Sequence, residues 1–207
     1  ISPCALRTTQ ALQRQGHAAF VVGGAVRDLI LGGKPKDFDI ATDATPEEVR
    51  QIFRRSRIIG RRFRLVHVLC GPEMVEVSTF RGAHTPDESD GGVADEHGRI
   101  LRDNVFGNQE QDATRRDFTL NALFYDPSTQ EGWDFHGGVA DLKQRRLRLI
   151  GDPERRYRED PIRMLRAVRF AASRGIEIDA ATRRPIRRLA GLLAHVPPSR
   201  LLDEMLK

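Results

Sequence analysis

Asp37 and Asp39 form an Asp-x-Asp pair inside the segment FVVGGAVRDLILGGKPKDFDIAT. In a β-strand, residues i and i+2 point to the same face and lie about 6.6 Å apart along the chain. Two carboxylates placed in this way supply the oxygen ligands that a hard divalent cation, Mg²⁺ or Mn²⁺, prefers. An isolated pair of this kind is more often a solvated loop, so its meaning depends on the residues around it.

Two glycines, Gly23 and Gly24, stand between the apolar run 18–22 and the helix-like sequence AVRDLIL. This order predicts a strand, a turn and a helix, and the backbone N–H groups of such a junction can bind phosphate with help from the helix dipole. Arg27 falls one turn into the helix, where its guanidinium can reach a phosphate oxygen. Asp28 either orients Arg27 or caps the turn. A phosphate site beside a metal site indicates nucleotidyl transfer from a nucleoside triphosphate.

A third carboxylate usually completes a site in which two metal ions lie about 3.5–4 Å apart. Glu76 lies in the alternating apolar segment 74–80, where a buried glutamate needs a partner. Asp117 opens the segment DFTLNAL. Both are candidates, and the sequence does not distinguish which of them contacts the metal.

Three further blocks follow the glycine segment in order: MVEVSTFRG, RRDFTLNAL and REDPIRMLRAVRFAA. With it, they resemble the polymerase-β-type nucleotidyltransferase superfamily, in the branch that contains bacterial poly(A) polymerases and tRNA CCA-adding enzymes. The resemblance runs from about Phe20 to the last residue. Within the branch, the segment 57–82 is similar to the poly(A) polymerase version.

The resemblance implies roles for the RRD block. A consecutive Arg115, Arg116 and Asp117 would otherwise be read as a solvated charge cluster. In the family, Arg116 and Asp117 hold the ribose or the phosphates, and Asn121 follows one helical turn later on the same face. We therefore place all four residues at the nucleotide site.

The resemblance also implies that Asp160 and Arg163 read the incoming base, whereas an N-cap with an i,i+3 ion pair would be the ordinary interpretation. An aspartate acceptor can meet the 6-amino group of adenine while an arginine donor meets ring N1. Cytosine offers the same pattern, so the pair admits A and C and rejects G and U. Arg166 and Arg169 follow Arg163 at three-residue spacing and are expected to face the triphosphate or the RNA end. A solvated arginine face remains an alternative.

The charge is unevenly distributed along the 207 residues. The whole chain carries 34 basic and 29 acidic residues, but residues 141–207 hold 17 basic and 9 acidic ones, a net charge of +8. A basic last third is expected for an element that faces a polyanion such as RNA. A solvated arginine-rich helical face is the alternative interpretation.

The two cysteines, Cys4 and Cys70, are far apart in a chain without a secretory leader, so we expect free thiols, a reducing compartment and a cytoplasmic location. No apolar run is long enough to span a membrane. The chain begins with Ile1 and stops within an expected helix at Lys207, so we interpret it as part of a longer protein.

Local patterns predict the secondary structure. We expect strands over 20–23, 38–42, 65–70 and 74–80, a long mobile loop over 83–114 and a helical FTLNALFY segment. A helix is also expected after Thr45, where Thr45 as N-cap and Glu48 form a capping box. Further helices are expected after Asp160, with Gly175 as the stop, after Asp179 and over VPPSRLLDEMLK.

These patterns and the resemblance together predict an α+β protein. Residues 1–140 are expected to form a catalytic nucleotidyltransferase head, with a small mixed β-sheet flanked by helices. Residues 141–207 are expected to form an all-helical neck that binds the base and RNA, and relatives continue into further RNA-binding domains that this chain lacks. The first hypothesis is a template-independent polynucleotide adenylyltransferase that adds AMP from ATP to RNA 3′ ends. A CCA-adding enzyme and a non-catalytic RNA-binding module are the alternatives.

Overall fold

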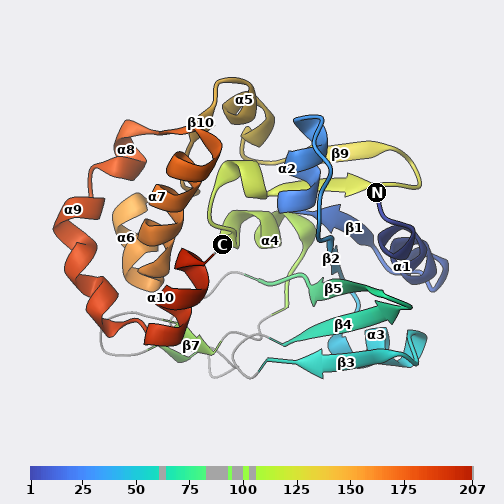
Figure 1. Ribbon diagram of the computed structural model, residues 1–207. Coiled ribbons are helices and arrows are strands. Elements are labelled where there is room, and N and C mark those ends of the chain that lie inside the picture. The colour runs from blue at the N-terminus through green and yellow to red at the C-terminus, as the bar shows by residue number, and fades with distance from the viewer. Residues whose placement is uncertain (61–63, 83–92, 95–99, 103–105, 207) are drawn as a thin grey trace.

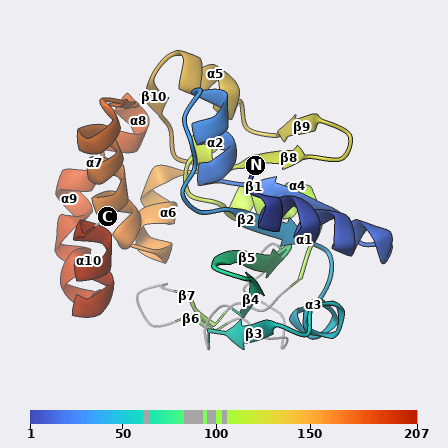
Figure 2. The same ribbon diagram turned by 45° about the vertical axis from the view of Figure 1, so that its right-hand side comes forward.

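The structure, a computed structural model, describes residues 1–60, 64–82, 93–94, 100–102 and 106–206. A β-sheet with flanking helices forms the first part, and the C-terminal helices gather on one side of this sheet (Figure 1). The same separation is seen after a turn of 45° (Figure 2). The expected α+β class is therefore confirmed.

Seven strands form the main sheet: β1 (Ala19–Val22), β2 (Asp39–Thr42), β3 (Ser56–Ile59), β4 (Leu65–Cys70), β5 (Glu73–Thr79), β8 (Leu123–Asp126) and β9 (Glu131–Asp134). Their order is β3-β4-β5-β2-β1-β8-β9. Only β2 and β5 run parallel among these neighbours, and every other pair is antiparallel. The sheet is mixed, as predicted.

The register of the central strands brings two carboxylates together. Asp39 is the first residue of β2 and pairs with Glu76 on β5 and with Val22 on β1. The chain enters the β1–α2 turn directly after Val22. The glycine turn, Asp39 and Glu76 therefore lie at neighbouring positions of one sheet edge.

Six helical elements accompany the sheet: α1 (Pro3–Arg14), α2 (Gly24–Ile30), α3 (Pro46–Ile52), α4 (Gln109–Arg115), the 3₁₀ turn η1 (Thr119–Asn121) and α5 (Gly138–Lys143). The start of α3 confirms the expected capping box, since Thr45 Oγ1 accepts from the Glu48 amide while the Glu48 carboxylate accepts from the Thr45 amide. Alternate strand residues such as Val21 and Ile40 are fully buried, and they belong to the same core as Leu12 of α1.

The C-terminal part contains α6 (Pro153–Glu159), α7 (Ile162–Arg174), α8 (Ala180–Arg183), α9 (Ile186–Leu189), the 3₁₀ turn η2 (Ala190–His195) and α10 (Pro198–Met205). Gly175 ends α7 in the left-handed conformation with φ 59°, as the sequence predicted. An all-helical neck is nevertheless wrong in one detail. β10 (Arg146–Leu147) and β11 (Glu177–Ile178) form a short parallel pair, because the chain is extended where it approaches α6 and again where it leaves α7.

Two other expectations were wrong. FTLNALFY is not a helix: it forms η1 and then β8, which pairs with both β1 and β9. Its apolar residues Leu120, Leu123 and Phe124 are all buried, so no solvent-facing side is left for an amphipathic helix. The segment 83–114 is not simply a loop, because Asn108 caps α4 and short strands β6 (Val93–Ala94) and β7 (Ile100–Arg102) pair within it. Residues 83–92 lie outside the described part.

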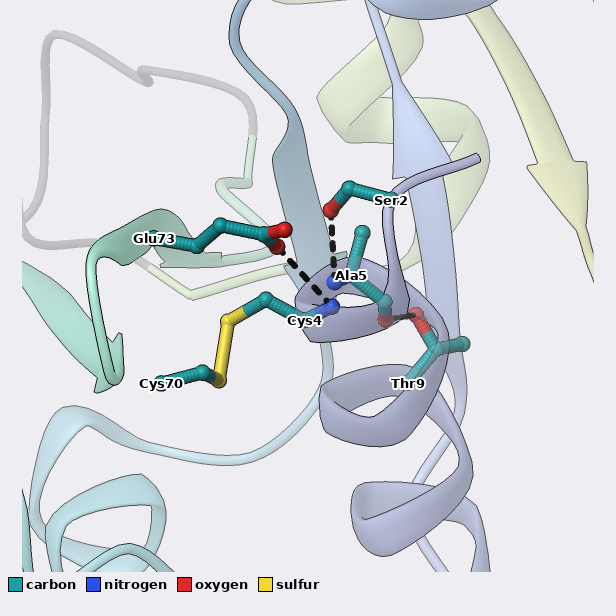
Figure 3. Close-up of a disulfide and its surroundings, with 6 residues drawn as sticks. All are labelled: Ser2, Cys4, Ala5, Thr9, Cys70 and Glu73. Carbon is teal, nitrogen blue, oxygen red and sulfur yellow. Dashed lines mark hydrogen bonds between the residues drawn. A yellow bond between two sulfur atoms is a disulfide. The ribbon is translucent and has the colours of Figure 1, made fainter.

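The expectation of free cysteines was also wrong. Cys4 and Cys70 form a disulfide with a Cα–Cα distance of 5.7 Å (Figure 3). The amide of Cys4 donates to Glu73 Oε2 at 3.1 Å, which further ties the start of α1 to the β4–β5 hairpin. A sequence separation of 66 gave no indication of this proximity, which arises only when α1 packs against the strands. Within the described residues, no helix is long and apolar enough to cross a membrane.

Candidate active site

A cavity of about 640 Å³ lies between the sheet and the C-terminal helices. Nearly all of the predicted site residues line it: Gly23, Gly24, Arg27, Asp39, Glu76, Arg115, Arg116, Asp117, Asn121, Asp160, Arg163, Arg166 and Arg169. The exception is Asp37, which is exposed outside this lining. The lining also includes residues that the sequence did not single out, namely Arg81, Asp112, Glu159 and Phe170.

The glycine turn adopts a backbone conformation that favours glycine and lies beside Arg116, Asn121 and Asp39. Gly23 has φ 73° and ψ −133°, a conformation that L side chains rarely adopt. A Cβ atom at Gly23 would meet Arg116 NH1 at 3.5 Å, Asn121 O at 3.7 Å and Asp39 Oδ2 at 3.9 Å. The amide of Gly23 donates to the Leu123 carbonyl at 3.1 Å and is therefore not available to a phosphate.

Gly23→Ala should weaken ATP binding about 10- to 100-fold, because alanine rarely adopts the backbone conformation of Gly23, and the turn that borders the cavity must shift to relieve the strain. Gly32→Ala is a matched control, since Gly32 has the same φ of 73° but no atom within 4 Å of an added Cβ. Equilibrium ATP titrations of both variants measure the difference. Equal ATP affinities in the two variants would show that the Gly23 turn makes no specific contribution to nucleotide binding.

Asp39 and Glu76 are the carboxylates that the sheet brings together. Both line the cavity, and the Glu76 side chain is 43% exposed with His67 Nε2 at 3.6 Å. Asp37 precedes β2, and the buried Phe38 separates it from Asp39. In the described part of the chain, no group of three or more His, Cys, Asp or Glu side chains converges as a metal cluster. Asp39 and Glu76 are a pair of carboxylates in the lining whose oxygen atoms could hold a hard cation, while Asp37 lies outside the lining.

Asp117 is held by several donors. Its Oδ1 accepts from the Phe118 amide at 2.7 Å and from Asn121 Nδ2 at 3.1 Å, and its Oδ2 accepts from Arg166 NH1 at 2.8 Å. Burial acts to raise the pKa of Asp117, but the charge and hydrogen bond of Arg166 outweigh it and the pKa is lowered. In this conformation both oxygen atoms of Asp117 serve protein donors.

Arg27 is buried rather than directed freely into the cavity. Its NH1 donates to Asn121 Oδ1 at 2.7 Å, its Nε donates to Asp28 Oδ1 at 2.9 Å, and its guanidinium lies 5.2 Å from the Phe170 ring centre. Asp28 therefore orients Arg27, one of the two roles considered for it. Arg27 therefore connects α2 to Asn121, and Asn121 in turn donates to Asp117.

The two arginines of the RRD block occupy different surroundings. Arg116 donates from Nε and NH2 to Asp112 Oδ2 at 3.1 and 2.9 Å. Burial lowers the pKa of Arg115 to about 10, and repulsion from Arg81, Arg156 and Arg163 contributes to the shift. Closely spaced cations of this kind favour an anionic ligand, which would relieve their repulsion.

The neck residues are paired with α10. Asp160 accepts two hydrogen bonds from Arg200, at 3.2 and 3.0 Å. Glu204, only 3% exposed, accepts from Arg169 Nε at 2.7 Å and from Arg166 at 3.3 Å. Arg27, Asn121, Asp117, Arg166, Glu204 and Arg169 thus form a continuous chain of hydrogen bonds from α2 to α10, which we call the head–neck network.

Two parts of the chain match known sequence families. Residues 19–148 match the family described as "Poly A polymerase head domain", and residues 175–207 match the one described as "Probable RNA and SrmB- binding site of polymerase A". The chain belongs to the poly(A) polymerase head-domain family.

Two curated relatives show where the chain lies within this family. It is 55% identical to Poly(A) polymerase I of Escherichia coli O157:H7 over 209 residues, which cover 100% of this chain and 45% of that protein. It is 38% identical to the CCA-adding enzyme of Lactobacillus helveticus, covering 98% of this chain and 49% of that enzyme. The chain therefore spans about half the length of the curated relatives that it matches.

A solved structure supports the fold assignment. The CCA-adding enzyme of Bacillus stearothermophilus in complex with CTP superimposes with a TM-score of 0.84 at 36% identity, covering 99% of this chain and 48% of that one. The nucleotidyltransferase fold that the sequence predicted is thereby confirmed.

Sequence reasoning missed Arg200 and Glu204. They lie four residues apart in the expected C-terminal helix, a spacing that is typical of a mutual ion pair on a solvated face. In the structure each of them instead contacts a different partner on or beside α7. The near-complete burial of Glu204 depends on how α10 packs against α7, which no local pattern reveals.

Proposed function

We propose that this protein is a polynucleotide adenylyltransferase that adds AMP from ATP to RNA 3′ ends without a template. The observation that carries the proposal is the shared cavity, which combines the Asp39–Glu76 carboxylates, the arginines of the RRD block and the Asp160/Arg163 pair. The chain is also 55% identical to a protein named Poly(A) polymerase I, which supports the transfer of AMP rather than CMP.

The carboxylate end of the cavity is assigned to the reacting groups. Asp37 and Asp39, with Glu76 as the third carboxylate, would hold Mg²⁺ or Mn²⁺, which activates the attacking 3′-hydroxyl and supports the leaving pyrophosphate. Arg115 and Arg116 would neutralise the charge of the triphosphate. Gly23 and Gly24 give these groups close access to the substrate because they carry no side chain.

The neck end is assigned to the base. Asp160 offers acceptors and Arg163 offers donors, the pattern that complements adenine or cytosine. In the structure Asp160 pairs with Arg200, and Arg163 NH1 donates to the Arg156 carbonyl at 2.8 Å. These contacts orient the two side chains. Because the pair suits both A and C, the choice between them would depend on the shape of the cavity.

RNA is the proposed second substrate. Residues 141–207 carry a net charge of +8, which suits a phosphate backbone. The match of residues 175–207 to a family described as a probable RNA-binding site points the same way. The cytoplasmic location was expected from free cysteines, which the Cys4–Cys70 disulfide contradicts, so it stays a prediction without that support.

A tRNA CCA-adding activity is the second candidate, supported by the superposition on an enzyme that was solved with CTP. The Asp160/Arg163 pair admits both A and C, so it does not separate the two activities. A non-catalytic RNA-binding module is disfavoured, because the carboxylates, glycines and arginines that catalysis needs are all retained.

The deciding experiment offers each nucleotide singly to the full-length protein with a plain RNA primer that has no tRNA fold. We expect a run of A residues from ATP and little incorporation from CTP, as read on a sequencing gel. A tRNA that lacks its 3′ end, supplied with CTP and ATP together, is the companion substrate. Addition that stops after C, C and A on this tRNA, with no tail on other RNAs, would assign the CCA-adding activity instead.

A further inference from the structure

Arg156 of α6 makes a contact between the two parts of the chain that neither the sequence nor the proposed function uses. Its NH2 group donates to the carbonyl oxygens of Arg115 and Arg116, each at 2.6 Å. Its NH1 group donates to Glu159 Oε2 at 2.8 Å. The side chain is only 13% exposed, so this contact lies within the structure rather than on its surface.

The two carbonyls belong to the turn that presents the RRD block. α4 ends at Arg115, and Arg116 is its C-cap in an extended conformation with φ −63° and ψ 168°. Carbonyl groups at a helix end lack intrahelical partners, and a cation placed there is favoured by the helix dipole. Arg156 therefore holds the backbone from which the Arg116 and Asp117 side chains project.

The NH1 group of Arg156 is linked through Glu159 to Arg163, at the end of the cavity proposed to read the base. Glu159 Oε2, which Arg156 holds, also accepts from Arg163 NH1 at 3.3 Å. The same NH1 group donates to the backbone carbonyl of Arg156 at 2.8 Å. Arg163 is thus fixed on two sides by groups that belong to Arg156 or are bound by it.

α6 is anchored firmly enough to transmit this position. Tyr157, the residue after Arg156, is fully buried, and its hydroxyl donates to the Thr182 carbonyl at 2.9 Å. Asp152 caps the start of α6 by accepting from the Arg155 amide at 2.8 Å. A side chain supported by a packed helix holds its partners more precisely than one on a loop.

Burial of Arg156 has an energetic cost that its neighbours do not fully offset. Burial lowers its pKa to about 10, and repulsion from Arg163 adds to the shift. Its Nε group is buried without a hydrogen-bond partner among the described residues. An apolar side chain could fill this position without that cost. The planar guanidinium of Arg156 instead donates to three groups at once, the carbonyls of Arg115 and Arg116 and the carboxylate of Glu159.

We propose that Arg156, with Glu159, is a positioning residue that sets the distance between the Arg116–Asp117 turn of the head and the base-reading Arg163 of the neck, and thereby contributes to the preference for ATP over CTP. The inference rests on the proposed function, since it assigns the base to the neck end of the cavity.

The test compares Arg156→Gln with Arg155→Gln in the purified protein. Arg155 is a matched control, because it lies next to Arg156 on α6 and donates to the same Glu159 at 3.1 Å, yet its side chain is 72% exposed. The readouts are the dissociation constants for ATP and for CTP in the presence of Mg²⁺, together with the thermal unfolding midpoint of each variant.

We expect Arg156→Gln to weaken ATP binding about 10- to 100-fold and to narrow the ATP-to-CTP preference, because the two halves of the site lose their fixed spacing. Arg155→Gln should stay within about twofold of the wild type, as expected for an exposed ion pair. Arg156→Lys should be intermediate, since an ammonium group keeps the charge but not the planar fork.

Two results would overturn the inference. One is an Arg156→Gln protein with a lower unfolding midpoint but a wild-type ATP-to-CTP ratio at a temperature where it is fully folded, which is the behaviour of a purely structural residue. The other is an equal loss of preference in Arg155→Gln. A wild-type protein that binds neither nucleotide would instead contradict the proposed function, and this inference with it.

Discussion

Asp39→Asn should reduce AMP incorporation by about 10³-fold or more, since a metal contributes several kcal/mol to the transition state. Asp39 lies exposed at the first position of β2 and lines the cavity, so the substitution removes a proposed cation ligand and leaves the core intact. Primer-extension rates at saturating ATP, with thermal unfolding recorded in parallel, measure the two effects. The unfolding midpoint should be unchanged within a few degrees.

Asp43→Asn provides the control for this substitution. Asp43 follows the other end of β2, is 50% exposed and contacts His17 at 3.2 Å, away from the cavity lining. Near-wild-type rates are expected for it. Asp37→Asn should be as severe as Asp39→Asn, although Asp37 lies outside the lining. Normal turnover in the Asp37 variant would remove it from the proposed metal set, and normal turnover in the Asp39 variant would refute the site.

Glu76→Gln and Asp117→Asn should both lower turnover by about 10²-fold or more, but for different reasons. Glu76 pairs with Asp39 across the β2–β5 register, so its loss should raise the Mg²⁺ concentration that gives half-maximal activity. Asp117 is occupied by Asn121 and Arg166, so its loss should misplace those groups and leave the Mg²⁺ requirement unchanged.

A Mg²⁺ titration of the two variants separates these roles. Asp117→Asn should also lower the free energy of unfolding by roughly 3 kcal/mol, because it breaks a buried ion pair, so rates are compared below its unfolding transition. A raised Mg²⁺ requirement in Asp117→Asn with none in Glu76→Gln would reverse the two assignments. Unchanged activity in both would show that neither carboxylate serves the site.

Local signals predicted most of the elements that carry the site. The Thr45 capping box, the strand at 65–70 and the Gly175 stop of α7 appear where the sequence placed them, because capping and alternation are short-range effects. The ordered motifs also named thirteen of the residues that line the cavity. Each of the four blocks places at least one of its candidate residues in the cavity lining.

Contacts that depend on packing could not be predicted in the same way. The FTLNALFY segment has a helical composition, but pairing with β1 and β9 converts its second half into a central strand. Cys4 and Cys70 meet because α1 lies across the sheet, and Glu204 is buried because α10 packs on α7. The different surroundings of Glu76 and Asp117 are likewise set by tertiary contacts, since Glu76 pairs with Asp39 across β2 and β5 whereas Asp117 accepts hydrogen bonds from Asn121 and Arg166.

The head–neck network has a consequence for chimaeric enzymes. It crosses from α2 to α10 through alternating donors and acceptors, so removing one member leaves its two neighbours with unmet hydrogen-bonding capacity. Effects of substitutions along it are then non-additive. A head transplanted onto the neck of a relative would need an arginine at the position of Arg166 and a carboxylate at that of Glu204. The head and the neck of this chain can therefore be exchanged between proteins only together, or with both partners of each contact retained.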